Sequence, residues 1–181
     1  MALQLYSFKP TINDIDSNFN PMHFTNEILN TNLCIENRSI KPVNEWCLCK
    51  KCLNLSTDRE CVCCIEFENL QKLCLDKKCI TLNKSFSKII LDEEILNITR
   101  QQMIVKTKNR KKRNNLRTLD NKTWRFICYK QFTHWVNSWS KLGKGCVQVI
   151  IPSCVVHKIR ETYPESNGNY IGFKDSNVLP S

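Results

Sequence analysis

The chain has 181 residues, with 27 Lys/Arg against 17 Asp/Glu, a formal net charge of +10, and ordinary globular contents of hydrophobic (41%) and charged (24%) residues. This length fits one domain with tails, and the four glycines exclude collagen, glycine-rich linkers and most glycine-loop nucleotide sites. The unusual feature is the content of twelve cysteines and only three histidines, so the role of the cysteines is the first question that the sequence raises.

The first segment, residues 1–42, is rich in asparagine, weakly patterned and interrupted by three prolines, so we expect a loosely ordered extension. It lacks the pattern of a signal peptide, and no window approaches the roughly 18 apolar residues of a membrane helix. We therefore expect an intracellular protein, cytoplasmic or nuclear and not secreted. Thiols stay reduced there, and clustered cysteines more often hold metal than form disulfides.

The next segment, residues 46–79, holds eight of the twelve cysteines and is loop-like in composition. Four thiolates around one ion form the usual structural zinc site. From spacing alone, the simplest interpretation is one ion held by the pairs Cys49–Cys52 and Cys61–Cys64. Two ions need eight ligand positions, which seven cysteines fill if one thiolate bridges. Buried free thiols or a disulfide framework would also account for a cysteine-rich segment.

Apolar spacing predicts the elements of the remaining chain. A helix is expected from about residue 81 to 104, and a clearer one over 122–142 whose apolar face would lie in the core. The apolar run 147–151 is typical of a short buried strand, and Pro152 suits the first turn of a helix that runs to about Tyr163. A short extended piece is expected over 170–173.

A strongly basic stretch separates the two predicted helices. Nine basic residues and one acid, Asp120, lie between Lys106 and Arg125, which accounts for most of the net charge. We expect a basic loop over 106–122. Such a run can contact phosphates through Lys108–Arg113, so a zinc-containing nucleic-acid-binding protein is the alternative function. No aromatic residue interleaves that run, which argues against a stacking platform for single strands.

A series of motifs runs from the cysteine segment to the C-terminal third. They are Trp46-Cys-x-Cys-x2-Cys52, Cys63-Cys64, Cys79-Ile-Thr81, Arg125-x3-Tyr129-x5-Trp135, Ile151-Pro-Ser-Cys154, Ile159-Arg160, Pro164 and Gly168-x-Tyr170-x-Gly-Phe-Lys174. In this order, over roughly residues 44–175, they resemble the cytoplasmic C-terminal "ballast" domain of the P2X purinoceptor 7 family. The last block is the most specific.

The resemblance implies a mostly helical mixed fold that holds a dinuclear zinc cluster. Carried over by motif, the seven zinc ligands are Cys47, Cys49, Cys52, Cys63, Cys64, Cys79 and Cys154. Cys61 and Cys74 have no counterpart in the motif. The number seven agrees with the count for two ions that share one thiolate.

The resemblance also implies a guanine-nucleotide site. The positions that match it are Arg125, Tyr129, Val149 and Ile151. Three others depart, since the family has His, Arg and Lys where this chain has Phe126, Val156 and Glu165. Losing two cations and gaining a carboxylate near phosphates should weaken nucleotide binding.

The sequence and the resemblance together predict one α+β domain over residues 43–175, helix-dominated with a few short strands, followed by a tail over 176–181. We expect a zinc-stabilised regulatory or binding module for a guanine nucleotide or a protein partner. It is not expected to be a channel, because it lacks membrane helices. It is also not expected to be an enzyme, because the motifs of zinc deaminases and phosphate loops are missing and all-thiolate zinc sites lack an open position.

Overall fold

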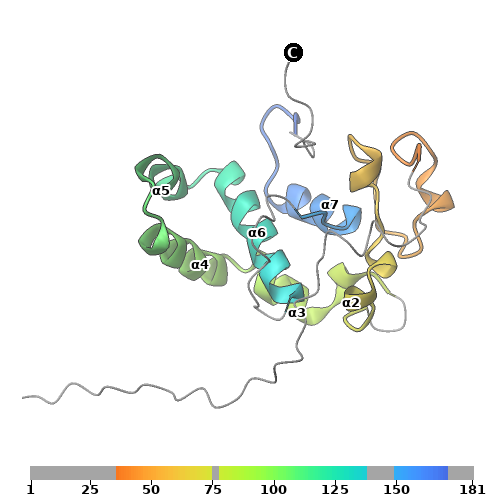
Figure 1. Ribbon diagram of the computed structural model, residues 1–181, viewed down its shortest axis with the longest axis horizontal. Coiled ribbons are helices and arrows are strands. Elements are labelled where there is room, and N and C mark those ends of the chain that lie inside the picture. The colour runs from red at the N-terminus through yellow and green to blue at the C-terminus, as the bar shows by residue number, and fades with distance from the viewer. Residues whose placement is uncertain (1–35, 75–77, 138–148, 171–181) are drawn as a thin grey trace, which may run out of the picture.

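The computed structural model describes residues 36–74, 78–137 and 149–170 (Figure 1). The α-helices of these ranges are α2 (Glu68–Gln71), α3 (Lys84–Phe86), α4 (Glu93–Lys106), α5 (Arg110–Arg117), α6 (Asn121–Val136) and α7 (Ser153–Thr162). Short 3₁₀ turns span Val43–Glu45, Asp58–Glu60, Cys64–Glu66 and Ile80–Leu82, and a π-helical turn spans Ser87–Leu91.

The prediction of an α+β fold is wrong, because the described ranges contain helices and irregular segments and no strand. Of the strand expected over 147–151, only 149–151 are described. These three residues are partly buried against the hydrophobic core, without ladder pairing. A strand needs the edge of a neighbouring strand for its hydrogen bonds, and the described surroundings offer only helices and turns. The last three residues of the extended piece expected over 170–173 lie outside the described residues.

The helix expected over 81–104 is divided into shorter pieces by two polar side chains. Asn83 accepts a hydrogen bond from the Ser85 amide at 2.8 Å and so begins α3. Asp92 accepts one from the Ile95 amide at 3.1 Å and so begins α4. Such N-cap carboxamides and carboxylates satisfy amides that have no partner inside the helix, which favours a new start over a continuous helix.

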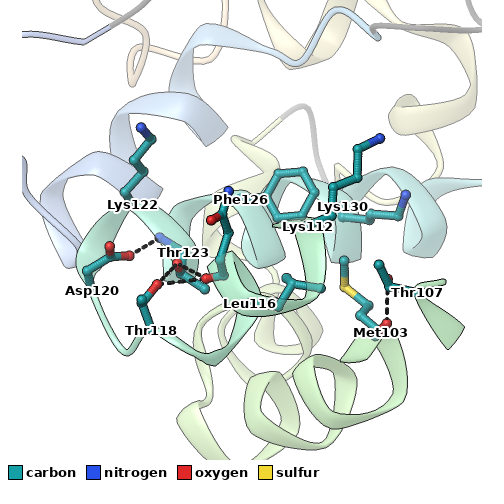
Figure 2. A pocket seen from close by; sticks show the side chains of 11 residues that line it. Met103, Thr107, Lys112, Leu116, Thr118, Asp120, Lys122, Thr123, Phe126 and Lys130 are labelled. Carbon is teal, nitrogen blue, oxygen red and sulfur yellow. Dashed lines mark hydrogen bonds between the residues drawn. The ribbon is translucent and has the colours of Figure 1, made fainter. Parts of the chain in front are cut away.

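The basic stretch forms a helix where a loop was expected. Asn109 caps α5 by accepting from the Lys112 amide at 3.0 Å, and Leu116 is buried on its inner side. Asp120 then begins α6 by accepting from the Thr123 amide at 2.7 Å, as Figure 2 shows. Lys and Arg have good helix propensity, so one cap and one apolar anchor are enough to order this charged run.

The predicted core helix is confirmed as α6 over Asn121–Val136, and residues 138–148 are not described. It lies between α4 and α7 and contacts both (Figure 1). Phe132 packs edge-on against Phe86, with ring centroids 6.3 Å apart, and Trp124 stacks on Tyr163 at 6.2 Å. The helix expected from Pro152 is confirmed as α7, with Pro152 as its N-cap residue.

Candidate metal centre

Seven buried cysteines bring their sulfur atoms together beneath the N-terminus of α7. They form two overlapping groups, Cys47, Cys49, Cys52 and Cys63 in one, and Cys49, Cys64, Cys79 and Cys154 in the other. Within each group all the sulfurs lie within 4.8 Å of one another. Cys49 belongs to both groups. These are the seven residues that the resemblance implied.

The sulfur separations suit a tetrahedral ion. Four sulfurs at about 2.3 Å from one ion lie about 3.8 Å apart along the edges of a tetrahedron. The Cys49 sulfur is 3.7 Å from those of Cys47 and Cys52, and the Cys64 sulfur is 4.0 Å from that of Cys79. A disulfide would bring two sulfurs to about 2.05 Å. The ten cysteines of the described ranges are all free thiols.

The turn Cys49–Cys52 points both of its sulfurs toward the same point. Lys50 takes the left-handed conformation, with φ of 60°, which folds the backbone back on itself within two residues. The amide of Cys49 donates to the sulfur of Cys63 at 3.4 Å. An amide directed at sulfur stabilises the thiolate that a metal requires.

A buried ion pair fixes the Cys63–Cys64 segment. Glu66 accepts a hydrogen bond from the Cys63 amide at 2.6 Å, and Arg38 forms a two-pronged pair with the same carboxylate at 2.8 and 2.9 Å. Arg38 also donates to the carbonyl of Cys61 at 3.2 Å and lies over the ring of Trp46. Arg38 thus connects the first described residues to the segment that carries two of the seven sulfurs.

Cys154 reaches the centre from far along the chain because Ser153 ties α7 to the cysteine segment. The Ser153 amide donates to the Val62 carbonyl at 2.9 Å. Its hydroxyl accepts from the Leu53 amide at 3.1 Å and donates to the Leu53 carbonyl. Cys154 follows in the first turn of α7, where the helix dipole favours a thiolate.

Because these thiols are crowded together, their pKa values shift in opposite directions. Hydrogen bonds from neighbouring thiols, Cys49 first, lower the pKa of Cys63 in one group and of Cys154 in the other. The hydrogen bond with Cys154 in turn raises the pKa of Cys64. Each group therefore contains thiols of lowered pKa beside thiols of raised pKa, and a bound cation would favour the thiolate form.

The remaining described cysteines lie outside both groups. Cys61 is buried, and its sulfur accepts from the Leu55 amide at 3.2 Å. The one-ion set Cys49, Cys52, Cys61 and Cys64 is therefore not what the fold assembles. Cys74 hydrogen-bonds Cys64 without joining its group, and Cys128 packs in the core, where burial raises the pKa of its thiol to about 12. Cys34 and Cys146 lie outside the described residues.

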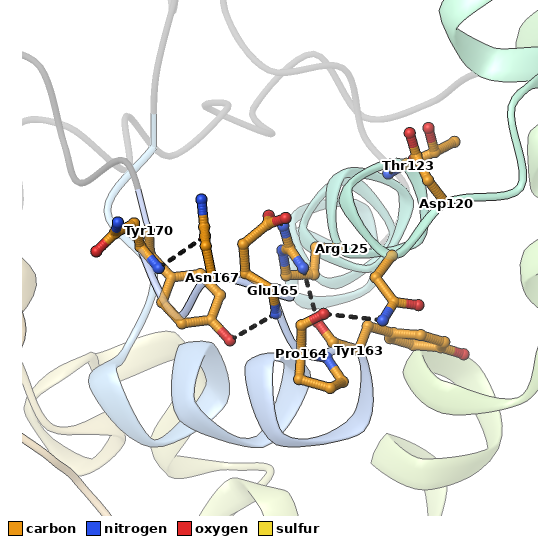
Figure 3. Close-up of polar contacts among 10 residues, drawn as sticks. Asp120, Thr123, Arg125, Tyr163, Pro164, Glu165, Asn167 and Tyr170 are labelled. Carbon is orange, nitrogen blue, oxygen red and sulfur yellow. Dashed lines mark hydrogen bonds and ion pairs between the residues drawn. The ribbon is translucent and has the colours of Figure 1, made fainter.

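Two of the positions that match the implied nucleotide site, Arg125 and Tyr129, lie on α6, and Figure 3 shows the contacts of Arg125. Arg125 is buried, donates to the Tyr163 carbonyl at 2.8 Å, forms an ion pair with Glu165 and lies over the ring of Tyr170 at 5.2 Å. Tyr129 is half-buried, which raises the pKa of its hydroxyl. Val149 and Ile151 pack partly buried against the core.

The three departing positions fall in different places. Glu165 forms an ion pair with Arg125, so its carboxylate occupies the guanidinium that the resemblance assigns to phosphate binding. Val156 is buried in α7. Phe126 of α6 is half exposed and lines a cavity to which the basic helix α5 also contributes (Figure 2).

Comparison with known proteins places the chain in a family. Residues 11–174 match the family described as the P2X purinoreceptor 7 intracellular domain, and the chain belongs to this family. It is 29% identical over 140 residues to P2X purinoceptor 7 of Rattus norvegicus, a match that covers 72% of this chain and 20% of the receptor. The chain thus corresponds to about a fifth of that receptor's length. The resemblance drawn from the motifs is confirmed.

None of the helices that the structure describes has the length and apolar character needed to cross a membrane.

The residues that position the sulfurs were not predicted from the sequence. Glu66, three residues after Cys63, repeats the spacing of a capping box, and this was a usable signal. Nothing in the sequence links Arg38 to Glu66 or Ser153 to Leu53, because these contacts depend on the folded chain.

Proposed function

We propose that the chain is a non-catalytic binding module stabilised by two zinc ions that share the Cys49 thiolate. The observation that carries the proposal is the pair of four-sulfur groups with one sulfur in common. Two separate tetrahedral sites would need eight thiolates, and seven suffice only when one bridges.

The donor set favours zinc. Seven thiolates with no imidazole or carboxylate among them are soft ligands, which suit zinc and iron–sulfur clusters and disfavour magnesium, calcium and manganese. In a zinc centre of this kind each ion has four thiolate ligands and no position left for water or substrate. The centre would therefore crosslink the fold and take no part in catalysis.

The expected role of the metal is structural because the seven sulfurs come from distant parts of the chain and meet at one buried place. Structural zinc in small domains contributes about 10–16 kcal/mol at neutral pH. This is comparable to the whole free energy of unfolding of a typical domain, about 5–15 kcal/mol. Metal binding and folding of the cysteine segment would then be one equilibrium.

Elemental analysis of the purified, reduced protein tests the proposal directly. We expect about two zinc ions per chain and no absorption in the visible range. Cys128→Ala is the matched control, since Cys128 is a buried thiol outside both groups and its loss should leave the metal content unchanged. One ion per chain, or a coloured iron centre, would contradict the proposal.

We propose that the module binds a protein partner inside the cell, because its family is described as an intracellular domain. A reducing compartment, cytoplasmic or nuclear, would also keep the thiolates available for metal.

Guanine-nucleotide binding stays a prediction of the resemblance, and the contacts of Arg125 define how to test it. A phosphate at Arg125 would have to displace the Glu165 carboxylate, so we expect weak binding of guanosine diphosphate to the natural chain. Glu165→Lys removes that competitor and restores the family's cation. Calorimetric titration should then show a clear gain in affinity, and equal affinity of both proteins would contradict the assignment of Arg125 to phosphate.

A further inference from the structure

A cavity of about 660 Å³ opens between α4, α5 and α6, on a part of the molecule that the metal centre does not use (Figure 2). Its apolar lining comes from Met103 of α4, Leu116 of α5 and Phe126 of α6. Pockets of this size hold ligands as large as a nucleotide. One of the three helices that form it is the basic helix α5, which takes no part in the metal centre.

One wall of the cavity carries an aromatic ring between two cations. Lys122, Phe126 and Lys130 follow one another at intervals of four residues on α6 and all line the cavity. Residues four apart share one face of a helix, with a rise of about 6 Å between them. Figure 2 shows the Phe126 ring between the two lysines. Phe126 is 50% exposed, so its ring is accessible to a ligand in the cavity.

The opposite wall adds positive charge. Lys112 of α5 also lines the cavity (Figure 2). The acidic residue in the lining is Asp120, whose carboxylate accepts from the Thr123 amide and caps α6. Its charge therefore faces the helix N-terminus that it stabilises. The lining of the cavity thus combines apolar side chains and one aromatic ring with three lysines.

We propose that this cavity binds single-stranded nucleic acid, with a base stacked on Phe126 and the adjoining phosphates on Lys122, Lys130 and Lys112. Stacking on aromatic rings inside a positive groove is how proteins hold single strands without reading their sequence. A membrane surface would need a convex apolar face. An acidic peptide would satisfy the lysines and leave the Phe126 ring without a flat partner.

The cavity lies apart from the metal centre, and its aromatic wall reverses an expectation from the sequence. No aromatic residue interleaves Lys108–Arg113 along the chain, but the fold brings Phe126 beside α5, which contains the last four residues of this run. The aromatic and basic parts of the site meet only because α5 and α6 are joined by a short turn.

Fluorescence anisotropy of the zinc-loaded full chain with labelled oligo-U and oligo-dT tests the proposal. We expect Phe126→Ala to weaken binding about tenfold or more, which is the range found for loss of one stacked base. Phe126→Trp should keep the affinity. Because Phe126 is half exposed, neither change should unfold the chain, and a thermal melt checks this.

A salt series separates this site from general attraction to a basic protein. Each phosphate contact on a single strand contributes about 0.7 to the slope of log affinity against log salt. Lys122→Ala and Lys130→Ala should each lower the slope by about that amount. Lys88→Ala is the matched control, since it removes the same charge from an exposed position outside the cavity.

Three results would overturn the proposal. The first is Phe126→Ala binding as tightly as the natural chain. The second is Lys88→Ala changing the slope as much as Lys122→Ala. The third is poly-glutamate or anionic phosphatidylserine vesicles competing as strongly as the oligonucleotides at equal charge. A preference between oligo-U and oligo-dT would support the proposal, and oligo-dU, which lacks the thymine methyl, would show whether the sugar decides it.

Discussion

The two halves of the described chain bury their residues in different ways. In residues 36–91, which contain short turns, half of the buried side chains are cysteines, while residues 92–170 contain the long helices. A cysteine side chain is small and buries less apolar area than the leucine, isoleucine and phenylalanine side chains beside it, so the cysteines contribute little through packing alone. We therefore expect the first half to depend on metal in addition to the hydrophobic core that both halves share.

The halves are nevertheless joined at two places. Cys154 and Ser153 bring the start of α7 into the cysteine segment, and Phe86 extends from that segment to Phe132 of α6. Loss of metal should therefore weaken the helical half without removing the contacts within it.

Removing the metal should have the largest effect. A strong zinc chelator is expected to unfold the segment 43–91, because about 10–16 kcal/mol of structural zinc binding would be lost there. Hydrogen exchange read by mass spectrometry should show fast exchange over 43–91 and slower exchange over α6. Uniform protection in both halves after chelation would contradict this contrast between them.

Replacing one of the seven cysteines should have the second-largest effect on folding. Cys64→Ser and Cys49→Ser are each expected to abolish stable folding, because each removes a thiolate ligand from a four-sulfur group and Cys49 belongs to both groups. Cys128→Ala removes a buried thiol outside both groups and should cost only about 1–2 kcal/mol, through lost packing. Thermal melts and metal analysis of the variants distinguish the cases. A soluble, fully zinc-loaded Cys64→Ser protein would be incompatible with its role as a ligand.

Breaking the Arg38–Glu66 pair sharpens the comparison within the cysteine half. Arg38→Met leaves the Glu66 carboxylate buried without its main charge partner, and we expect a loss of about 2–3 kcal/mol in denaturant unfolding. The double variant Arg38→Met with Glu66→Gln should recover part of this loss, since no buried charge is left unpaired. No recovery would mean that the pair acts through packing alone.

The smallest expected effect is a gain in the stability of the folded protein. Lys50 has φ of 60°, which costs a residue with a side chain about 1–2 kcal/mol and costs glycine almost nothing. Lys50→Gly should stabilise the metal-loaded protein by about 1 kcal/mol, less the added freedom of the unfolded chain. Lys51→Gly, at the neighbouring position without positive φ, should destabilise it slightly. Thermal melts of the two variants measure both effects, and equal effects would argue against the left-handed turn.

The sequence allowed the helical half to be predicted better than the cysteine half. The apolar repeat of α6 and the proline before α7 are local signals, and both predicted helices are present. The segment 106–122 was expected as a loop because its charge dominates its composition. The Asn109 cap and the buried Leu116, which order α5, are single residues that a charge count overlooks.

The candidate site was predictable only through family motifs. Spacing alone favoured a set that includes Cys61, whereas the fold turns Cys61 toward Leu55 and brings in Cys154 through the Ser153 contacts. The order of the motifs implied the seven cysteines that the structure gathers. Their role as zinc ligands stays a prediction. The expected strand was wrong because an apolar run reports burial, and burial against helices needs no strand pairing.

The central claim is that one thiolate, Cys49, joins two metal ions. Cadmium-113 NMR of the cadmium-substituted chain tests it most directly, because two ions that share a sulfur couple to each other through it. We predict two resonances in the range typical of four thiolate ligands, each split by coupling to the other. Two unsplit resonances, or a single one, would contradict a shared Cys49.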